Sequence, residues 1–273
     1  MNAPAELSRP LVEIRASALS DFLDCPARAE ARHLLGKRTP TTGAAQLGTA
    51  VHASTAAFDQ STLDGAGLTV SDSFAAAVDA IYKPENDVLW EDDYPATDAE
   101  KTAKALHGKY CTEVAPKQTY AAVEVKCERL EITDIGIALT GTTDRVRQVG
   151  DGYGIADVKT GKTAVASDGH VETKGHTYQL GVYELLAERA SGLPITEPAQ
   201  IIGLQTGKTD KAQRVGIGEI VGARDVLIGE EDSPGVLEIV ARMIHSGLFP
   251  GNPRSMMCGP KYCPIYSTCK FRR

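Results

Sequence analysis

Apolar side chains in the first 115 residues recur every three or four positions, which is the spacing of an amphipathic helix. Within residues 17–35, Leu19 and Phe22 follow this spacing, but the pair Cys25-Pro26 interrupts it, because a proline removes a hydrogen bond inside a helix. We therefore expect either one helix that begins at Pro26 or two short helices that meet there. Further helices are predicted over residues 48–58, 71–81 and 97–114.

From residue 120 onward, the apolar positions follow the pattern of strands joined by turns. Strands are predicted over residues 121–130, 137–149, 153–159, 199–205 and 214–221, and helices over residues 178–190 and 235–245. Helices followed by strands interleaved with helices indicate a single α/β domain with a helical N-terminal cap. Its regions are a mainly helical cap (16–115), an α/β core (116–249) and a tail rich in cysteine, proline and glycine (250–273), all within one domain over residues 1–273.

With 273 residues, 42% apolar and 24% charged, the chain has the composition of a globular protein. It has no run of about 18 apolar residues, which a membrane-spanning helix needs, and residues 1–15 lack the apolar centre of a secretory signal. We therefore expect a cytoplasmic protein that does not enter a membrane. The six cysteines should then stay reduced, and reduced cysteines that cluster favour metal or redox sites over disulfides.

The formal net charge of −7 argues against a uniformly basic nucleic-acid-binding surface. The charge is unevenly distributed, however, because residues 250–273 hold five basic side chains and no acidic one. This basic C-terminal segment could contact phosphate groups.

An acid and a lysine emerge together from the predicted strand 153–159. Asp157 and Lys159 are two positions apart and therefore point to the same face of the sheet, while Asp144 lies on the preceding strand in Gly-Thr-Thr-Asp-Arg. Two carboxylates suit a hard divalent cation such as Mg²⁺ or Mn²⁺. The lysine can orient or activate an attacking water or stabilise charge on a phosphate. Taken alone, Asp-x-Lys is also the pattern of an exposed strand edge or a surface ion pair.

Three further residues strengthen the interpretation of a site. His52 follows Gly48 by four positions on a predicted helix, and Gln179 and Tyr183 are spaced i, i+4 on another helix, so that they share one face. In this order, Gly-x-x-x-His, Gly-Thr-x-Asp-Arg, Asp-x-Lys-Thr and Gln-x-x-x-Tyr resemble the motifs of the RecB-like branch of the PD-(D/E)XK nucleases. The resemblance runs from residue 17 to residue 269.

The resemblance implies a restriction-endonuclease-like core, in which a mixed sheet is flanked by helices. It implies that Asp144, Asp157 and the main-chain carbonyl of Val158 are metal ligands. His52 would be a further ligand, which favours Mn²⁺ over Mg²⁺ because imidazole is a softer donor than oxygen. Lys159 would be the catalytic lysine.

The resemblance also implies that Gln179 and Tyr183 position the scissile strand. Each of two further residues, Glu124 and Arg145, allows two interpretations. Glu124 is either an extra acid in the cleft or an exposed strand carboxylate. Arg145 either contacts the phosphate of the substrate or pairs with an acid.

The tail contains Cys258, Cys263 and Cys269 within twelve residues, and Cys25 is the candidate for a fourth ligand. Cysteine followed by proline, as at Cys25 and Cys263, also occurs around iron–sulfur clusters. A zinc site would have the same number of ligands, but zinc ligands usually come in closely spaced pairs. We therefore favour a four-iron four-sulfur cluster over zinc.

Some RecB-like nucleases resemble this layout. The CRISPR adaptation exonuclease and the AddB-type helicase–nucleases carry one cysteine before the nuclease motifs and three after them around such a cluster. Their tail spacing is C-x2-C-x5-C, whereas it is C-x4-C-x5-C here. The implied role is a staple that joins the chain ends, and the Asn-Pro-x-Ser sequence before the cysteines is similar to phage-encoded relatives.

The sequence is therefore interpreted as a divalent-metal-dependent DNA exonuclease that hydrolyses phosphodiester bonds in single strands or at DNA ends. The expected setting is phage or bacterial DNA recombination, replication or repair, in the host cytoplasm if the protein is phage-encoded, with recombination or replication proteins as possible partners. Two alternatives remain. One is an inactive DNA-binding module of the same fold, and the other is a redox or regulatory protein that works through its cysteine cluster.

Overall fold

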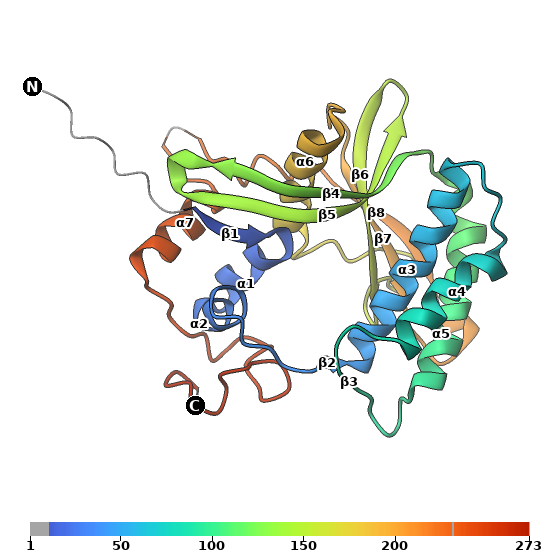
Figure 1. Ribbon diagram of the computed structural model, residues 1–273, viewed down its shortest axis with the longest axis horizontal. Helices are drawn as coiled ribbons and strands as arrows, with labels where there is room; N and C mark the ends of the chain where they lie inside the picture. Colours follow the sequence, from blue (N-terminus) through green and yellow to red (C-terminus); the bar gives the residue numbers. More distant parts are fainter. Residues whose placement is uncertain (1–10, 231, 273) are drawn as a thin grey trace, which may run out of the picture.

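A mixed six-stranded sheet forms the centre of the molecule in the computed structural model, which describes residues 11–230 and 232–272 (Figure 1). Its strands are β1 (Val12–Arg15), β4 (Tyr120–Ile132), β5 (Ile137–Val149), β6 (Gly152–Gly161), β7 (Ala199–Gln205) and β8 (Val215–Ile220). The β1–β5 and β6–β7 pairs are parallel, and the β4–β5, β5–β6 and β7–β8 pairs are antiparallel. This mixed sheet confirms the predicted fold class.

Strand β5 is the branching point of this sheet. Strand β4 pairs with it over residues 137–147, whereas β1 pairs with residues 137–140 and β6 with residues 145–149. Because a strand has two edges, β1 and β6 must share the edge that β4 does not use. Residues 141–144 of β5 therefore lie between the part of this edge that pairs with β1 and the part that pairs with β6. Neither strand pairs with these four residues, so their edge is accessible to a site.

Helices cover both faces of the sheet. The helices of one side are α3 (Gly43–Leu63), α4 (Val70–Tyr82) and α5 (Ala96–Lys109), and those of the other are α1 (Leu19–Asp24), α2 (Pro26–Ala29), α6 (Thr177–Ser191) and α7 (Val236–Ser246). Figure 1 shows α3, α4 and α5 side by side at one end of the molecule and α1 and α2 at the other. Residues 16–115 thus contribute to both faces.

The alternation of side chains along β6 assigns each face of this strand to one hydrophobic core. Ala156 and Val158 pack in the core beneath α3, α4 and α5, whereas Ile155 packs in the core that contains α6. Asp157 and Lys159 consequently belong to the α6 face, as period-two alternation requires. The strand therefore presents its acid and its lysine toward the helix that carries Gln179 and Tyr183.

The helices and strands broadly follow the predicted ranges, with informative differences. Two short helices meet at Cys25-Pro26, as one of the two alternatives foresaw, and residues 30–34 continue them as a π-helical turn. Helix α3 extends five residues beyond its predicted range at each end. Strand β1 was not predicted, nor were the two-residue strands β2 (Thr41–Thr42) and β3 (Val88–Leu89). None of the helices in the described ranges has the length and apolar character required to cross a membrane.

In the C-terminal tail, residues 250–272 form no regular helix or strand and pack against the junction of α1 and α2 (Figure 1). The main-chain N–H of Asn252 donates to Sγ of Cys25 at 3.3 Å, and the Asn252 amide donates to the carbonyl of Asp24 at 2.9 Å. The Ser255 hydroxyl donates to the Asp24 carboxylate at 2.6 Å. These contacts fasten the tail to the junction of α1 and α2.

Candidate active site

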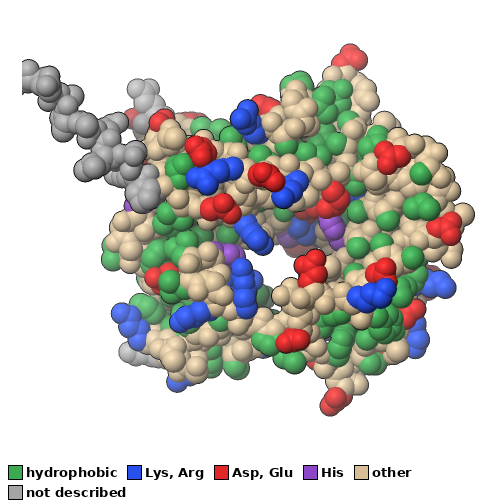
Figure 2. Space-filling view, viewed as in Figure 1, with side chains coloured by type: hydrophobic (Ala, Val, Ile, Leu, Met, Phe, Trp, Pro, Cys, Tyr) green, Lys and Arg blue, Asp and Glu red, His purple; other side chains and the backbone are tan. Residues whose placement is uncertain are grey.

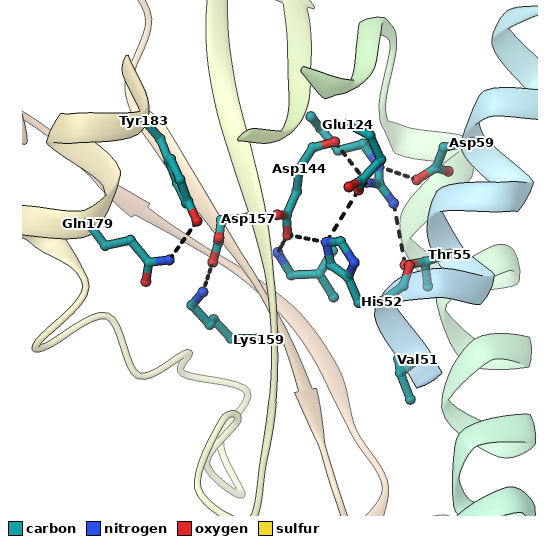
Figure 3. A network of polar contacts seen from close by, with 12 residues as sticks. Val51, His52, Thr55, Asp59, Glu124, Asp144, Asp157, Lys159, Gln179 and Tyr183 are labelled. Atoms are coloured by element: carbon teal, nitrogen blue, oxygen red, sulfur yellow. Dashed lines mark hydrogen bonds and ion pairs between the residues drawn. The ribbon is translucent and has the colours of Figure 1, made fainter. Parts of the chain in front are cut away.

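Three potential ligand atoms converge where α3, β4 and β5 meet. Nε2 of His52 lies 3.0 Å from Oδ2 of Asp144 and 3.4 Å from Oε1 of Glu124, and the ligand atoms of the three residues lie within 4.8 Å of one another. Figure 3 shows their side chains pointing toward one another from a helix and two strands. One imidazole nitrogen and two carboxylates could hold a divalent cation such as Mn²⁺ or Mg²⁺.

Glu124 reaches this group because β4 and β5 pair in register around it. Val123 lies opposite Arg145 and Val125 opposite Thr143, so Glu124 stands across from Asp144. Glu124 has a φ of 52°, and among the described residues it is the non-glycine residue with a left-handed backbone. Its carboxylate is 41% exposed and contacts His52. The structure therefore favours the interpretation of Glu124 as an acid of the cleft.

The other acid of the site, Asp157, is 1% exposed and sits beside Lys159. Nζ of Lys159 lies 2.5 Å from Oδ2 of Asp157. The ammonium therefore compensates the charge of this buried carboxylate. The ligand atoms of His52, Glu124 and Asp144 are consistent with a bound divalent metal.

The two buried aspartates have pKa values shifted in opposite directions. Burial, reinforced by the negative charge of Asp144, raises the pKa of Asp157 to about 6. Burial also acts to raise the pKa of Asp144, but the hydrogen bond and charge of His52 and the charge of Lys159 bring it below its usual value. In turn, burial opposes protonation of His52, while Asp144 and Glu124 raise its pKa above the usual value.

Gln179 and Tyr183 lie together on α6, on the opposite side of Asp157 from His52 (Figure 3). The Gln179 amide donates to the Tyr183 hydroxyl at 3.0 Å, and burial raises the pKa of Tyr183, so that this phenol stays protonated. Tyr183 lines the same cavity as His52, Glu124 and Asp144. The four-residue spacing on the helix therefore produces the shared face that the sequence predicted.

This cavity has a volume of about 860 Å³ and is open to solvent. Arg15 and Lys126 line it together with the acids, so that both signs of charge face the same space. Figure 2 shows the molecule hollowed near its centre, with basic, acidic and histidine side chains gathered around the hollow. The cavity is large enough to admit a substrate segment to the acids.

Arg145 does not line this cavity and is 0% exposed. Its Nε donates to Oδ2 of Asp59 at 2.7 Å, and its Nη1 donates to Oε1 of Glu124 at 3.2 Å. Of the two interpretations of Arg145, the structure therefore favours pairing with acids over contact with a substrate phosphate. Asp59 belongs to no recognisable sequence motif, although it follows His52 by seven residues and thus by two helical turns.

A second cluster forms at the C-terminal tail. The residues Cys25, Cys258, Cys263 and Cys269 all line one narrow cavity. Burial raises the pKa of the Cys263 thiol, and the proximity of the other three sulfurs raises it further. The two remaining cysteines, Cys111 and Cys127, are buried elsewhere. The structure thus brings together the four cysteines that the sequence grouped.

The chain belongs to the PD-(D/E)XK nuclease superfamily, whose pattern it matches over residues 14–270. Among solved structures it is similar to the crystal structure of SSO0001, with a TM-score of 0.44 and 12% identity over 98% of this chain and 91% of that chain. No curated protein matches the sequence. Membership of the superfamily implies a metal-dependent nuclease that hydrolyses phosphodiester bonds in DNA with Mg²⁺ or Mn²⁺.

Proposed function

We propose that the protein is a divalent-metal-dependent DNA exonuclease of the RecB-like branch, acting on single strands or DNA ends. The observation that carries this proposal is the convergence of His52, Glu124 and Asp144 on one open cavity, with the Asp157–Lys159 ion pair on the adjacent strand β6. The order of the sequence motifs supports the RecB-like assignment. The proposed setting is recombination, replication or repair of phage or bacterial DNA.

The metal would be held by His52 and Asp144, with Glu124 as a partly exposed third ligand. Asp157 and the main-chain carbonyl of Val158 would complete the coordination from β6. The imidazole favours Mn²⁺ over Mg²⁺. When bound, the ion would offset the negative charge that develops on the phosphate during hydrolysis.

The remaining polar residues of the site would position the substrate. The Lys159 ammonium, held beside Asp157, would orient the attacking water or stabilise charge on the phosphate. Gln179 and Tyr183 would contact the sugar–phosphate backbone at the scissile bond, because both are neutral hydrogen-bonding groups on one helix face. Arg15 and Lys126 would attract the backbone electrostatically into the cavity.

The enclosure of the site supports action on a strand end. Helix α3 lies on one side of the central hollow and α1 and α2 lie on the other (Figures 1 and 2). A strand with a free end can enter such a hollow lengthwise, whereas a continuous duplex is wider and stiffer. Few aromatic side chains are available for base stacking in a chain with 5% aromatic residues, so we expect weak sequence preference.

Cys25 and the three cysteines of the tail would hold a four-iron four-sulfur cluster, with zinc as the alternative occupant. Their convergence on one cavity and the N–H···S hydrogen bond from Asn252 to Cys25 support thiolate ligation, because N–H donors are common around cluster sulfurs. The cluster would act as a staple between the tail and the α1–α2 junction. Iron, sulfide and zinc analysis of the purified protein distinguishes the two occupants.

Digestion of end-labelled linear single-stranded DNA with Mn²⁺ tests the proposed activity. We expect the wild type to release nucleotides and Lys159→Ala to be slower by about a hundredfold or more. The matched control is Lys101→Ala, which removes an exposed lysine on α5 that pairs with Asp98. DNA binding without cleavage by the wild type would favour the binding module instead.

A circular single strand of the same sequence separates exonuclease from endonuclease activity. An exonuclease leaves the circle intact while it degrades the linear strand. Equal cleavage of both substrates would overturn the proposed dependence on ends, and equal cleavage by the wild type and Lys159→Ala would remove Lys159 from the mechanism.

A further inference from the structure

We propose that the buried Arg145–Asp59 pair is the positioning element of the metal site, which fixes His52 and Glu124 relative to Asp144. The inference rests on the proposed function, because it assumes that these three residues bind the metal. It assigns to Arg145 a role within the protein in place of a substrate contact. Asp59 acquires a role that no motif of the sequence indicates.

The pair joins the two elements that carry the main ligands. Asp59 lies on α3, two helical turns after His52 and on the same side of the helix. Arg145 follows Asp144 directly on β5. The 2.7 Å contact between Nε of Arg145 and Oδ2 of Asp59 therefore fastens the helix of one ligand to the strand of another.

The same guanidinium group reaches all three ligand-bearing elements, α3, β4 and β5. Its Nη1 donates to the main-chain carbonyl of Asp144 at 2.8 Å and to Oε1 of Glu124 at 3.2 Å. Its Nη2 donates to the hydroxyl of Thr55 at 3.4 Å, one turn after His52 on α3. A planar group with five N–H donors can satisfy such divergent acceptors, whereas a lysine ammonium at the end of a flexible stem cannot.

A second buried donor, the hydroxyl of Tyr110, also holds Asp59. The Tyr110 hydroxyl donates to Oδ2 of Asp59 at 2.5 Å, and the Tyr110 and Tyr120 hydroxyls lie 3.0 Å apart. Asp59 is 2% exposed, so its carboxylate has little freedom to move. The acid therefore acts as a fixed anchor for the guanidinium group.

Glu124 gives a separate indication that Arg145 has a positioning role. A non-glycine residue with φ near +52° costs energy unless surrounding contacts enforce that conformation. The hydrogen bond from Arg145 is one such contact, and it directs the Glu124 carboxylate toward His52. Loss of the guanidinium would release both the strained backbone and the carboxylate.

A purely stabilising role makes a different prediction. Buried ion pairs can often be replaced by apolar residues of similar volume without loss of stability. If the pair only stabilised the fold, such a replacement would leave metal affinity unchanged. If it positions the ligands, the replacement would weaken metal binding in a protein that remains folded.

The decisive variant is the double substitution Asp59→Leu with Arg145→Met in the full-length chain. It removes one negative and one positive charge, so the net charge near the metal is unchanged. We measure Mn²⁺ affinity by calorimetric titration and confirm folding by circular dichroism and thermal unfolding. We expect Mn²⁺ binding to be weaker by about tenfold or more, the usual effect of losing residues that orient metal ligands.

Single variants test the same role if the double variant does not fold. Arg145→Lys keeps the charge and the pairing with Asp59 but cannot reach Glu124 and the Asp144 carbonyl together, so it should also weaken Mn²⁺ binding. The matched control is Arg147→Met, which removes another buried arginine of β5 that donates to the carbonyl of Pro198 at 2.5 Å. We expect the control to bind Mn²⁺ as the wild type does.

Wild-type Mn²⁺ affinity in a folded double variant, or in Arg145→Lys if the double variant does not fold, would overturn the positioning role. Failure of the proposed function gives a different result. If Asp144→Asn binds Mn²⁺ as tightly as the wild type, then the metal site itself is wrong, and the positioning role is overturned with it. Weaker binding by Asp144→Asn but not by the pair variants rejects only the further inference.

Discussion

Oδ2 of Asp144 accepts a hydrogen bond at 2.9 Å from the main-chain N–H of Val158. One active-site acid on β5 is thus tied to the backbone of β6 immediately after the other acid, Asp157. Because the peptide group is rigid, this bond fixes the spacing of the two acids more tightly than a contact between side chains would. The hydrogen bond can form because neither β1 nor β6 pairs with β5 at residues 141–144.

Asp157→Asn should abolish nuclease activity and at the same time stabilise the metal-free protein. Burial and the nearby Asp144 raise the pKa of Asp157 to about 6, so at pH 8 the folded state carries an unfavourable charge that the amide lacks. We expect a gain in the free energy of unfolding on the order of 2 kcal/mol at pH 8. Chemical denaturation in the presence of EDTA measures it.

The pH dependence provides the control for this prediction. A raised pKa in the folded state means that the associated stability is present below the unfolded pKa and is lost as the pH rises through about 6. The difference between Asp157→Asn and the wild type should therefore largely disappear at pH 4. A gain that is equal at pH 4 and pH 8 would show that charge is not its cause.

Gly203→Ala should disturb the connection between Lys159 and α6. A Cβ atom at Gly203 would lie 2.9 Å from the carbonyl oxygen of Ala164 and 2.9 Å from Cγ2 of Val165, and both belong to the segment that leads from β6 to α6. We expect a loss of about 1–3 kcal/mol in the free energy of unfolding together with reduced nuclease activity. Denaturant titration and the linear-strand digestion measure the two effects.

Gly48→Ala is the matched control for that substitution. A Cβ atom at Gly48 meets no atom within 4 Å, and the residue lies inside α3. Alanine should therefore stabilise the helix by about 0.5–1 kcal/mol. If both variants were destabilised equally, the close contact at Gly203 would not explain the loss.

The sequence anticipated elements whose signal is local. Strand β7 covers residues 199–205 as predicted, because its seven residues form one buried run. Helix α3 was predicted over only 48–58, because alanine, serine and threonine occupy both of its faces and weaken the helical period. Strand β1 has four residues, and its parallel pairing with β5 joins segments more than 120 residues apart, which no local pattern reveals.

In the candidate site, too, some residues can be recognised from local sequence motifs, whereas others can be recognised only from tertiary contacts. Residues within recognisable motifs, such as His52, Asp144 and Lys159, could be selected from the sequence, and the structure brings them together. Asp59 could not be selected, because an acid in a helix is ordinarily exposed and only the tertiary contact with Arg145 shows its burial. The full burial of Arg145 likewise depends on packing between α3 and the sheet.

Cys263→Ser should release the C-terminal tail. If the four cysteines hold a cluster, loss of one thiolate lowers the iron content per chain and removes the visible absorbance. The tail would then become sensitive to trypsin at its basic residues, since little regular structure holds it. The control is Cys111→Ser, which changes a buried thiol outside the cysteine cavity and should retain the iron. Equal iron content in both variants would contradict cluster ligation by Cys263.

Glu184→Gln should remove a pH-dependent component of stability that lies away from the metal site. Burial raises the pKa of Glu184 to about 7, and the positive charge of Arg224 offsets this only in part, since its Nε lies 3.8 Å from the carboxylate. The stability that Glu184 provides is thus complete below its unfolded pKa of 4.5 and is lost as the pH rises through about 7. The wild type should therefore lose more stability than Glu184→Gln between pH 5 and pH 8, by a few kcal/mol at most.

Denaturant midpoints at several pH values, in EDTA so that metal binding does not contribute, measure this difference. Glu238→Gln serves as the control, because it changes a carboxylate on α7 that is 37% exposed and pairs with Arg242, away from Glu184 and Arg224. An exposed pair contributes little to stability, so this variant should follow the pH profile of the wild type. Parallel profiles for the wild type and Glu184→Gln would show that Arg224 fully compensates the burial of Glu184.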